Sequence, residues 1–207
     1  MKTIETYDKF ALEYDEWFDN HPLLYQAELK AIKQAIPVDG VGIEIGVGTG
    51  RFALPLGIKY GVEPSKAMAS IAKQRGIIIK EAVAENLPFT DQRFDFVTMI
   101  TVDCFISDLP KAFLEVYRIL KSNGSLIIGM IDKASELGQE YEDKKQTNKF
   151  YKDAFFHTVE ELTSILTQCE FKNFQYWQTL IKSDSKEIQF PEEGYGKGSF
   201  VVIKAFK

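Results

Sequence analysis

The sequence has little cysteine and little histidine, with two residues of each in a chain of 207. Cys104 and Cys169 stand in no metal-binding or redox spacing, so we expect reduced thiols and no metal site. An excess of basic residues is also lacking, because the net charge is −5 and no basic block occurs. This acidic balance argues against a nucleic-acid partner and against binding to an anionic membrane.

Long apolar runs are absent as well. No segment approaches the length of a membrane span, and residues 1–5 lack the apolar stretch of a signal peptide. These absences favour a cytoplasmic protein with no membrane partner. Aromatic residues, by contrast, are plentiful, and the 16 Phe and 9 Tyr lead us to expect that some line a cavity. The length suits one domain spanning 1–207.

Short apolar runs alternate with helix-like segments through the middle of the chain, which indicates a parallel sheet with both faces covered. A short or irregular helix is expected after Gly50, because Pro55 lies too deep in it. A turn is expected at Asn123 and Gly124. The runs predict a buried strand at the start of 41–52 and further strands at 58–63, 77–79, 94–100 and 125–131. Two more strands are expected at 173–181 and 199–206, joined by a long hairpin loop. The other expected helices cover 3–19, 22–35, 64–75, 108–121 and 158–169.

Two segments outside this alternation are expected on the ligand side of the sheet. Residues 1–36 include an aromatic helix face, with Phe10, Tyr14 and Trp17 at helical spacing, and we interpret them as an N-terminal helical lid. Residues 133–157 are charged and then aromatic, and we interpret them as a substrate-side insertion made of a helix and a loop. For any single aromatic residue in these segments, packing in the core is an equally good interpretation.

Three glycines, Gly46, Gly48 and Gly50, follow the first apolar strand at alternate positions. Such a loop permits close approach of the backbone and positive φ angles, and a following helix can present N–H groups to a ligand. A P-loop would need Gly-Lys-Ser or Gly-Lys-Thr at its end, and a dinucleotide fingerprint would need glycine in place of Arg51. The spacing therefore disfavours both kinds of site.

Two acidic residues flank this loop. Glu63 ends the second strand, where a carboxylate can accept hydrogen bonds from both hydroxyls of a ribose. Glu44 lies inside an apolar strand, which is costly without a partner. The partner of Glu44 is a ligand ammonium group, a nearby N–H group or the glycine loop itself.

Four segments in sequence order resemble the motifs of one family: 44–50, 61–65, 84–97 and 112–124. The first two resemble the glycine-rich and acidic motifs of class I S-adenosylmethionine-dependent methyltransferases. The last two resemble segments of the small-molecule branch, the type 11 or ubiquinone-biosynthesis-like methyltransferases, although Ser122 and Asn123 replace its usual Pro and Gly. The resemblance implies a Rossmann-like three-layer α/β sandwich with a mostly parallel, seven-stranded sheet and an antiparallel last strand.

The resemblance also implies S-adenosyl-L-methionine as the cofactor. Glu44 would support its amino group, and Glu63 would accept hydrogen bonds from its ribose hydroxyls. Val83 stands where the family has an acid, so Glu85 or a backbone carbonyl would accept from the adenine amino group instead. The residues implied to contact the cofactor are Glu44, Gly46, Val47, Gly48, Gly50, Glu63, Pro64, Met68, Ala84, Glu85, Thr101 and Val102.

Methyl transfer from a sulfonium is an in-line displacement, which positioning and desolvation can accelerate without a nucleophilic residue. A general base is needed only for an acceptor that arrives protonated. Capping, surface or core roles are the alternatives for each candidate base. Because the chain is acidic, we expect a small-molecule acceptor with an N, O or C nucleophile rather than a nucleic acid. The candidate bases are Asp103, Tyr14 and His157, followed by His21 and Tyr151.

Two other functions fit part of these features. A non-catalytic S-adenosylmethionine-binding domain would keep the glycine loop and Glu63 without a usable acceptor pocket. A nicotinamide-dependent oxidoreductase would share the first strand and Glu63, but it would need room for a pyrophosphate beside Arg51.

Overall fold

The computed structural model describes residues 2–182 and 185–207, so Met1 of the predicted lid and 183–184 of the predicted hairpin loop lie outside the described residues. Eight strands of the described residues form one sheet in the order β3-β2-β1-β4-β5-β8-β6-β7. Their bounds are β1 Gly42–Ile45, β2 Tyr60–Val62, β3 Ile78–Lys80, β4 Phe94–Ile100, β5 Leu120–Ile131, β6 Lys172–Thr179, β7 Glu192–Glu193 and β8 Phe200–Phe206.

The five strands from β3 to β5 are parallel, as the sequence predicts. The chain runs outward from β1 through β2 to β3, and then returns to the other side of β1 with β4 and β5. The strand order therefore reverses between β1 and β4, where Ile45 pairs with Met99. In open α/β sheets, ligands bind beyond the carboxyl ends of the strands at this position.

The other end of the sheet is antiparallel. The last strand, β8, lies between β5 and β6 and runs against both, which confirms the predicted antiparallel last strand. The eighth strand, β7, was not predicted. Glu192 and Glu193 pair with Gln178 and Trp177 at the β6 edge, and Gly194 and Gly196, both at positive φ, follow β7 on the way to β8.

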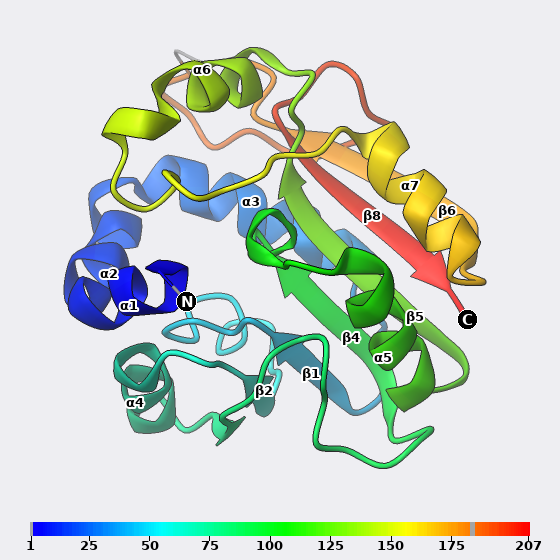
Figure 1. Ribbon diagram of the computed structural model, residues 1–207. Coiled ribbons are helices and arrows are strands. Elements are labelled where there is room, and N and C mark those ends of the chain that lie inside the picture. The colour runs from blue at the N-terminus through cyan, green and yellow to red at the C-terminus, as the bar shows by residue number, and fades with distance from the viewer. Residues whose placement is uncertain (1, 183–184) are drawn as a thin grey trace.

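Helices cover both faces of the sheet (Figure 1). Figure 1 shows α5 and α7 in front of the sheet and α3 behind it, with α1, α2 and α6 beyond the arrowheads of β4 and β5. Two short 3₁₀ turns, Asp103–Phe105 and Lys145–Thr147, follow β4 and α6. The helices are α1 Lys2–Lys9, α2 Ala11–Asn20, α3 Pro22–Ala35, α4 Lys66–Gln74, α5 Leu109–Ile119, α6 Glu136–Lys144 and α7 Val159–Gln168.

Local sequence signals explain where most of these helices begin and what they bury. Asp108 precedes α5 and accepts a hydrogen bond from the Lys111 N–H, and the apolar stripe of α5 is buried against the sheet. The expected helix start at 158 is confirmed by a capping box, in which Thr158 and Glu161 bond reciprocally at the start of α7. The apolar face of α3 packs on β5, β6 and β8, so α3 belongs to a covering layer of the sandwich.

The segment after Gly50 is irregular, as expected from Pro55: residues 51–57 form a run of turns in which the Leu54 N–H donates to the Gly50 carbonyl, while the Arg51 carbonyl accepts from the Tyr25 hydroxyl. Two local predictions are wrong. The expected helix over 3–19 is divided at Phe10, whose φ of −118° separates α1 from α2. Strand β5 begins at Leu120, before the turn that was predicted at Asn123. The residues between Leu120 and Ser125 form a bulge opposite β4, and Asn123 has a positive φ within it. No helix in the described part of the chain is long and apolar enough to cross a membrane.

Candidate active site

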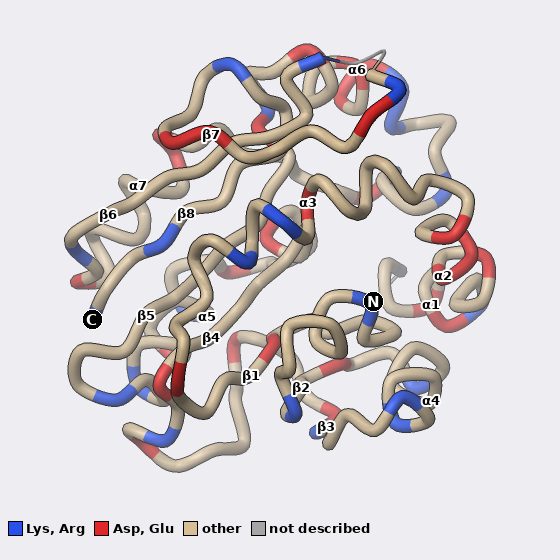
Figure 2. The backbone as a smooth tube through the Cα atoms, turned by 180° about the vertical axis from the view of Figure 1, so that it is seen from behind, with Lys and Arg blue, Asp and Glu red and all other residues tan. Residues whose placement is uncertain are grey.

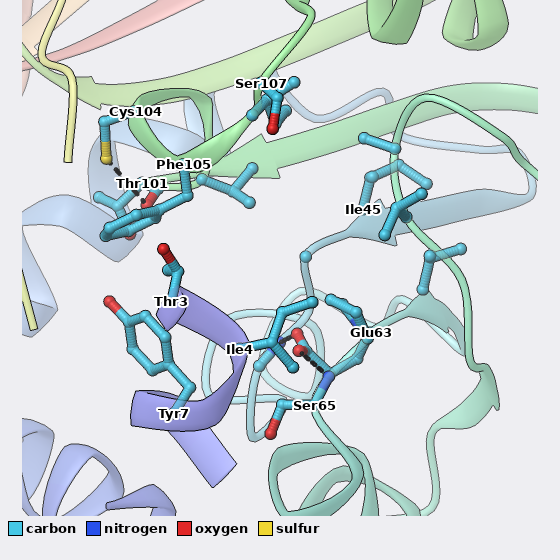
Figure 3. Close-up of a pocket in the computed structure, with 18 of the residues that line it drawn as sticks. Thr3, Ile4, Tyr7, Ile45, Glu63, Ser65, Thr101, Cys104, Phe105 and Ser107 are labelled. Carbon is cyan, nitrogen blue, oxygen red and sulfur yellow. Dashed lines mark hydrogen bonds between the residues drawn. The ribbon is translucent and has the colours of Figure 1, made fainter. Parts of the chain in front are cut away.

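A cavity of about 760 Å³ opens where the parallel strands end, within the size range of small-molecule sites. Residues at the ends of β1, β2 and β4 form one wall, and α1 lies across from them. Figure 3 shows Thr3, Ile4 and Tyr7 of α1 facing Phe105 and Glu63 across the opening. The cavity therefore lies at the position that the topology predicts.

The glycine loop after β1 is held tightly against the sheet. The N–H groups of Gly46 and Val47 both donate to the Val62 carbonyl, at 2.8 and 3.0 Å. Gly46 has a φ of +71°, and a Cβ atom there would lie 2.4 Å from Val102 Cγ2. Only glycine satisfies both the conformation and the contact, so the loop backbone itself lines the cavity at Gly46 and Gly48.

Glu63 organises the rim of the cavity beside this loop. Its Oε2 accepts from the Gly48 N–H at 2.8 Å, and its Oε1 accepts from the Ser65 N–H at 2.9 Å. Burial raises the pKa of Glu63 to about 7, although these two backbone hydrogen bonds oppose the rise. Each carboxylate oxygen still has a lone pair for a ligand hydroxyl.

Glu44 is an isolated acid in the middle of β1. It is 2% exposed, and its Oε2 atom has no hydrogen-bond partner among the residues that the structure describes. Burial, and then the charge of Glu63, raise the pKa of Glu44 well above its usual value. An orphaned acceptor of this kind is unfavourable unless a ligand amino group or a bridging water completes it.

Asp103 and His157 come together although they are far apart in the sequence. His157 lines the cavity, and its Nδ1 atom lies 3.3 Å from Asp103 Oδ2. Both side chains are buried, and Asp103 lies behind the histidine. This is the arrangement in which an acid orients an imidazole and leaves its Nε2 atom free to accept a proton.

The other three candidate bases occupy different environments. Tyr14 lines the cavity, where burial and then the charge of Glu28 raise its pKa. Tyr151 is stacked on Phe105 outside the lining. His21 lies outside the site, because its Nδ1 atom is 2.9 Å from the Trp17 carbonyl and its ring stacks on Trp17.

The N-terminal helices are fastened over the cavity by polar contacts. Asp8 of α1 accepts from Ser65 Oγ at 2.7 Å and from the Ala67 N–H at 3.0 Å, which gives α4 a second cap. Asp15 of α2 accepts from both Arg51 and Arg75. Figure 2 shows the acidic residues of α2 beside the basic residues of α4.

Comparison with known proteins places this geometry in a family. A model of the methyltransferase domain matches residues 43–128. The crystal structure of an S-adenosylmethionine-dependent methyltransferase of Thermotoga maritima, described as a candidate histamine N-methyltransferase, has a TM-score of 0.95 and 48% identity, and the match covers 98% of this chain and 99% of that chain. An uncharacterized protein of Methanocaldococcus jannaschii is 48% identical over 205 residues, which are 99% of this chain and 100% of that protein.

A third relative belongs to the branch that the motifs predict. The chain is 30% identical over 147 residues to the ubiquinone/menaquinone biosynthesis C-methyltransferase UbiE of Geotalea uraniireducens, across 61% of this chain and 62% of that protein. The chain belongs to the class I S-adenosylmethionine-dependent methyltransferases. The predicted family, enzyme class and fold class are therefore confirmed, with eight strands in place of seven.

The cavity of this methyltransferase fits S-adenosylmethionine on three structural observations. The side-chain-free surface at Gly46 and Gly48 admits a ligand close to the backbone. The carboxylate of Glu63 keeps lone pairs that face the same space, and the orphaned oxygen of Glu44 lies nearby behind the loop. Among the described residues, no group of three or more His, Cys, Asp or Glu could hold a metal ion.

The predicted cofactor residues of the methyltransferase divide into two groups. Val47 and Gly50 point away from the cavity. Val47 packs over Gly61, and Gly50 faces Ile77 and Ala72. Glu44 is likewise absent from the cavity wall within the described residues. The residues that do line the wall are Gly46, Gly48, Glu63, Pro64, Met68, Ala84, Glu85, Thr101 and Val102.

Two of the lining residues also stabilise the backbone of the cavity wall. Thr101 has a φ of +49°, an uncommon conformation for a β-branched residue, and its N–H donates to Gly129 at 2.7 Å. Such backbone geometry is often retained at functional sites. Glu85 Oε1 lies 3.2 and 3.4 Å from the N–H groups of Ser107 and Asp108, so it ties two loops of the wall together.

The sequence predicts an N-terminal lid, but sequence reasoning did not identify which residues of α1 line the methyltransferase cavity. Thr3, Ile4 and Tyr7 line it, and the Tyr7 ring packs on Tyr14 and Phe105 at 5.4 and 5.5 Å. Tyr7 precedes Tyr14 by two helical turns, and that spacing is the signal that could have added it to the aromatic face.

Proposed function

We propose that this methyltransferase moves the methyl group of S-adenosylmethionine to a small-molecule acceptor by in-line displacement. One cavity that brings polar and aromatic groups together carries the proposal. The glycine loop and Glu63 form its polar part, and the rings of Tyr7, Tyr14 and Phe105 form an aromatic part that begins beside the loop, where Tyr14 lies next to Gly48. The net charge of −5 supports a small acceptor rather than a nucleic acid.

The polar part of the cavity would hold the cofactor. Glu63 would accept from the ribose hydroxyls, and Glu44 would accept from the amino group directly or through a water molecule. Pro64 and Met68 would pack on the adenine or the ribose, and Glu85 would lie at the adenine edge. Thr101, Val102 and Ala84 would complete the wall.

The aromatic part of the cavity would position the acceptor and exclude water. When bound, the cofactor supplies an electrophilic methyl group, whose bond to sulfur breaks with its electron pair staying on sulfur as the acceptor forms its bond to carbon. For an acceptor that arrives protonated, His157 would take the proton on Nε2 while Asp103 holds the opposite side of the ring. Tyr14 would contact the acceptor through its ring.

We further propose that α1 and α2 form the lid and that 133–157 forms the substrate-side insertion. The ion pair between Lys149 and Glu13 supports these two roles, because it links the 133–157 insertion to α2 of the lid. The likeness to the Thermotoga protein supports an amine as an acceptor to be tested first.

Calorimetry with S-adenosylhomocysteine and with NAD tests the cofactor. Saturable heat with S-adenosylhomocysteine and none with NAD is expected, and the opposite pattern would refute the proposal. A methyl-acceptor screen with a metabolite library, read as release of S-adenosylhomocysteine, then tests catalysis. Binding of the cofactor without turnover of any compound would favour the non-catalytic binding domain.

A further inference from the structure

The end of the 133–157 insertion places every second side chain in the cavity wall. The residues that line the cavity are Asp153, Phe155 and His157. The two residues between them, Ala154 and Phe156, are buried in a small hydrophobic cluster instead. Side chains that alternate in this way are typical of extended backbone. The insertion therefore presents a stripe of three side chains to the cavity, with an acid, an aromatic ring and an imidazole in sequence.

Backbone hydrogen bonds fix this stripe in place. The Phe155 N–H donates to the Cys104 carbonyl at 2.8 Å, which joins the insertion to the 3₁₀ turn after β4. The Lys133 N–H donates to the His157 carbonyl at 2.9 Å. Figure 3 shows Cys104 across the opening from Glu63. The stripe thus lies apart from the carboxylate that is proposed to hold the ribose, where an acceptor is expected.

Phe155 is the large apolar member of the stripe, and its side chain is 64% exposed. A single exposed phenylalanine is ordinary on a protein surface. This one, however, lines the cavity next to the proposed base, because the ring centroids of Phe155 and His157 lie 5.2 Å apart. Lys133 Nζ lies 5.4 Å from the centre of the Phe155 ring. The ammonium group occupies one face of the ring, and the exposed remainder can receive a flat partner.

We infer that Phe155 stacks on an aromatic ring of the acceptor and selects for acceptors that carry one. This inference rests on the proposed function and names its substrate class, a small aromatic compound whose nucleophilic atom lies on the ring or next to it. A ring stacked on Phe155 brings its substituents toward the neighbouring imidazole of His157. Aromatic pairs contribute binding energy beyond the area that they bury, so a saturated ring of the same size gains less.

Three pairs of compounds test the inference, each with one polar group on an aromatic or a saturated ring. The pairs are 4-ethylphenol with 4-ethylcyclohexanol, phenylacetate with cyclohexylacetate, and benzylamine with cyclohexylmethylamine. Binding is measured by calorimetry on protein saturated with S-adenosylhomocysteine. A saturated ring is at least as apolar as an aromatic one, so apolar contact alone gives no preference for the aromatic member. At least one aromatic member should bind more tightly than its partner by about two- to tenfold, the usual gain from an aromatic pair.

Variants of Phe155 separate stacking from apolar contact. Phe155→Leu should abolish the preference, because leucine keeps an apolar side chain but cannot stack. Phe155→Tyr, which keeps a ring, should retain it. Phe190→Leu is the matched control and should match the wild type, since Phe190 is equally exposed but lies outside the cavity wall in the described part of the chain. A lack of aromatic preference in all three pairs, whether or not the compounds bind, would overturn the inference, and so would a preference that survives Phe155→Leu.

Turnover separates this inference from the proposed function. For an aromatic acceptor found in the library screen, Phe155→Leu should raise KM about threefold or more while kcat and the affinity for S-adenosylhomocysteine stay near the wild-type values. A preferred acceptor without an aromatic ring would overturn the inference and leave the proposed methyl transfer intact. A wild-type protein that fails to bind S-adenosylhomocysteine would refute the proposed function instead.

Discussion

At the scale of single residues, Glu63 serves the protein and the proposed ligand at once. Its two carboxylate oxygens hold the N–H groups of Gly48 and Ser65, so it fixes the loop and the start of α4 before any ligand binds. The same oxygens border the cavity. A residue that is already held in place costs little entropy when it binds a ribose.

Replacing Glu63 by alanine should weaken binding of S-adenosylhomocysteine by about 1.5–3 kcal/mol, the usual loss for hydrogen bonds to a charged group. Isothermal calorimetry measures this change, and circular dichroism verifies that the variant is folded. Glu81→Ala is the matched control, because Glu81 is exposed and pairs with Lys73 outside the cavity. Unchanged affinity in a folded Glu63→Ala protein would contradict the ribose role.

Gly46 and Gly57 make a second residue-scale comparison, because both have φ near +70° and only one is crowded. A Cβ atom at Gly57 would meet no atom of the described residues within 4 Å, whereas one at Gly46 would strike Val102. Gly57→Ala should therefore cost only the left-handed strain of about 1–2 kcal/mol. Gly46→Ala should cost about 2–4 kcal/mol, because overpacking is added. Urea unfolding measures both, and equal losses would show that the contact with Val102 is unimportant.

At the scale of elements, α2 is held to the glycine loop and to α4 by one carboxylate. Burial opposes ionisation of Asp15, but hydrogen bonds from Arg75 and Arg51 outweigh it and lower its pKa. Within the described part of the chain, Asp19 of the same helix bonds Arg51 alone, and its side chain is largely exposed. Two acids on one helix thus differ in burial and in the number of arginines they hold.

Asp15→Asn should destabilise the protein by about 1–3 kcal/mol, because two arginines lose a charged acceptor. Hydrogen exchange should also become faster in α1 and α2 than in the sheet, as expected for a lid that opens locally. Asp19→Asn should leave exchange near the wild-type rate, since exposed ion pairs contribute little. Similar exchange in both variants would argue against Asp15 as the fastening residue.

The elements that the sequence predicts correctly depend on neighbouring residues. The capping box at Thr158, the glycine turn at Gly46 and the acid at the end of β2 all act within a few positions of themselves. The wrong predictions depend on distant partners. The break at Phe10 coincides with packing on Phe150, and the early start of β5 depends on the pairing of Leu120 with Phe94.

The candidate site divides in the same way. The glycine loop and Glu63 follow from their motif spacing, and the structure places them on one wall. The pairing of Asp103 with His157, and that of Tyr7 with Phe105, join segments whose distance in space no local pattern encodes. The burial of Glu44 in β1, beneath the glycine loop, follows from the apolar strand around it, but the missing partner of its Oε2 atom among the described residues depends on the packing of the whole sheet.

At the scale of the whole molecule, buried acids set how stability depends on pH. Burial raises the pKa of Glu28 to about 8 and that of Glu63 to about 7, from an ordinary value near 4.5. Between about pH 4.5 and 8 the folded protein therefore keeps protons that the unfolded chain has lost. Raising the pH through this window favours the state with fewer bound protons, which is the unfolded one.

The ligand-free protein should therefore lose stability as the pH rises from about 5.5 to 8.5, with a slope approaching about 1.4 kcal/mol per pH unit for each such carboxyl. Urea unfolding at several pH values gives the slope. Glu28→Gln should make it shallower, because glutamine cannot ionise, while the exposed change Glu16→Gln should leave it unaltered. The acids whose pKa values are lowered, such as Asp15 and Asp95, act in the opposite direction and only below about pH 4. A free energy of unfolding that stays constant or increases from pH 5.5 to 8.5 would mean that Glu28 and Glu63 are already ionised in the folded protein.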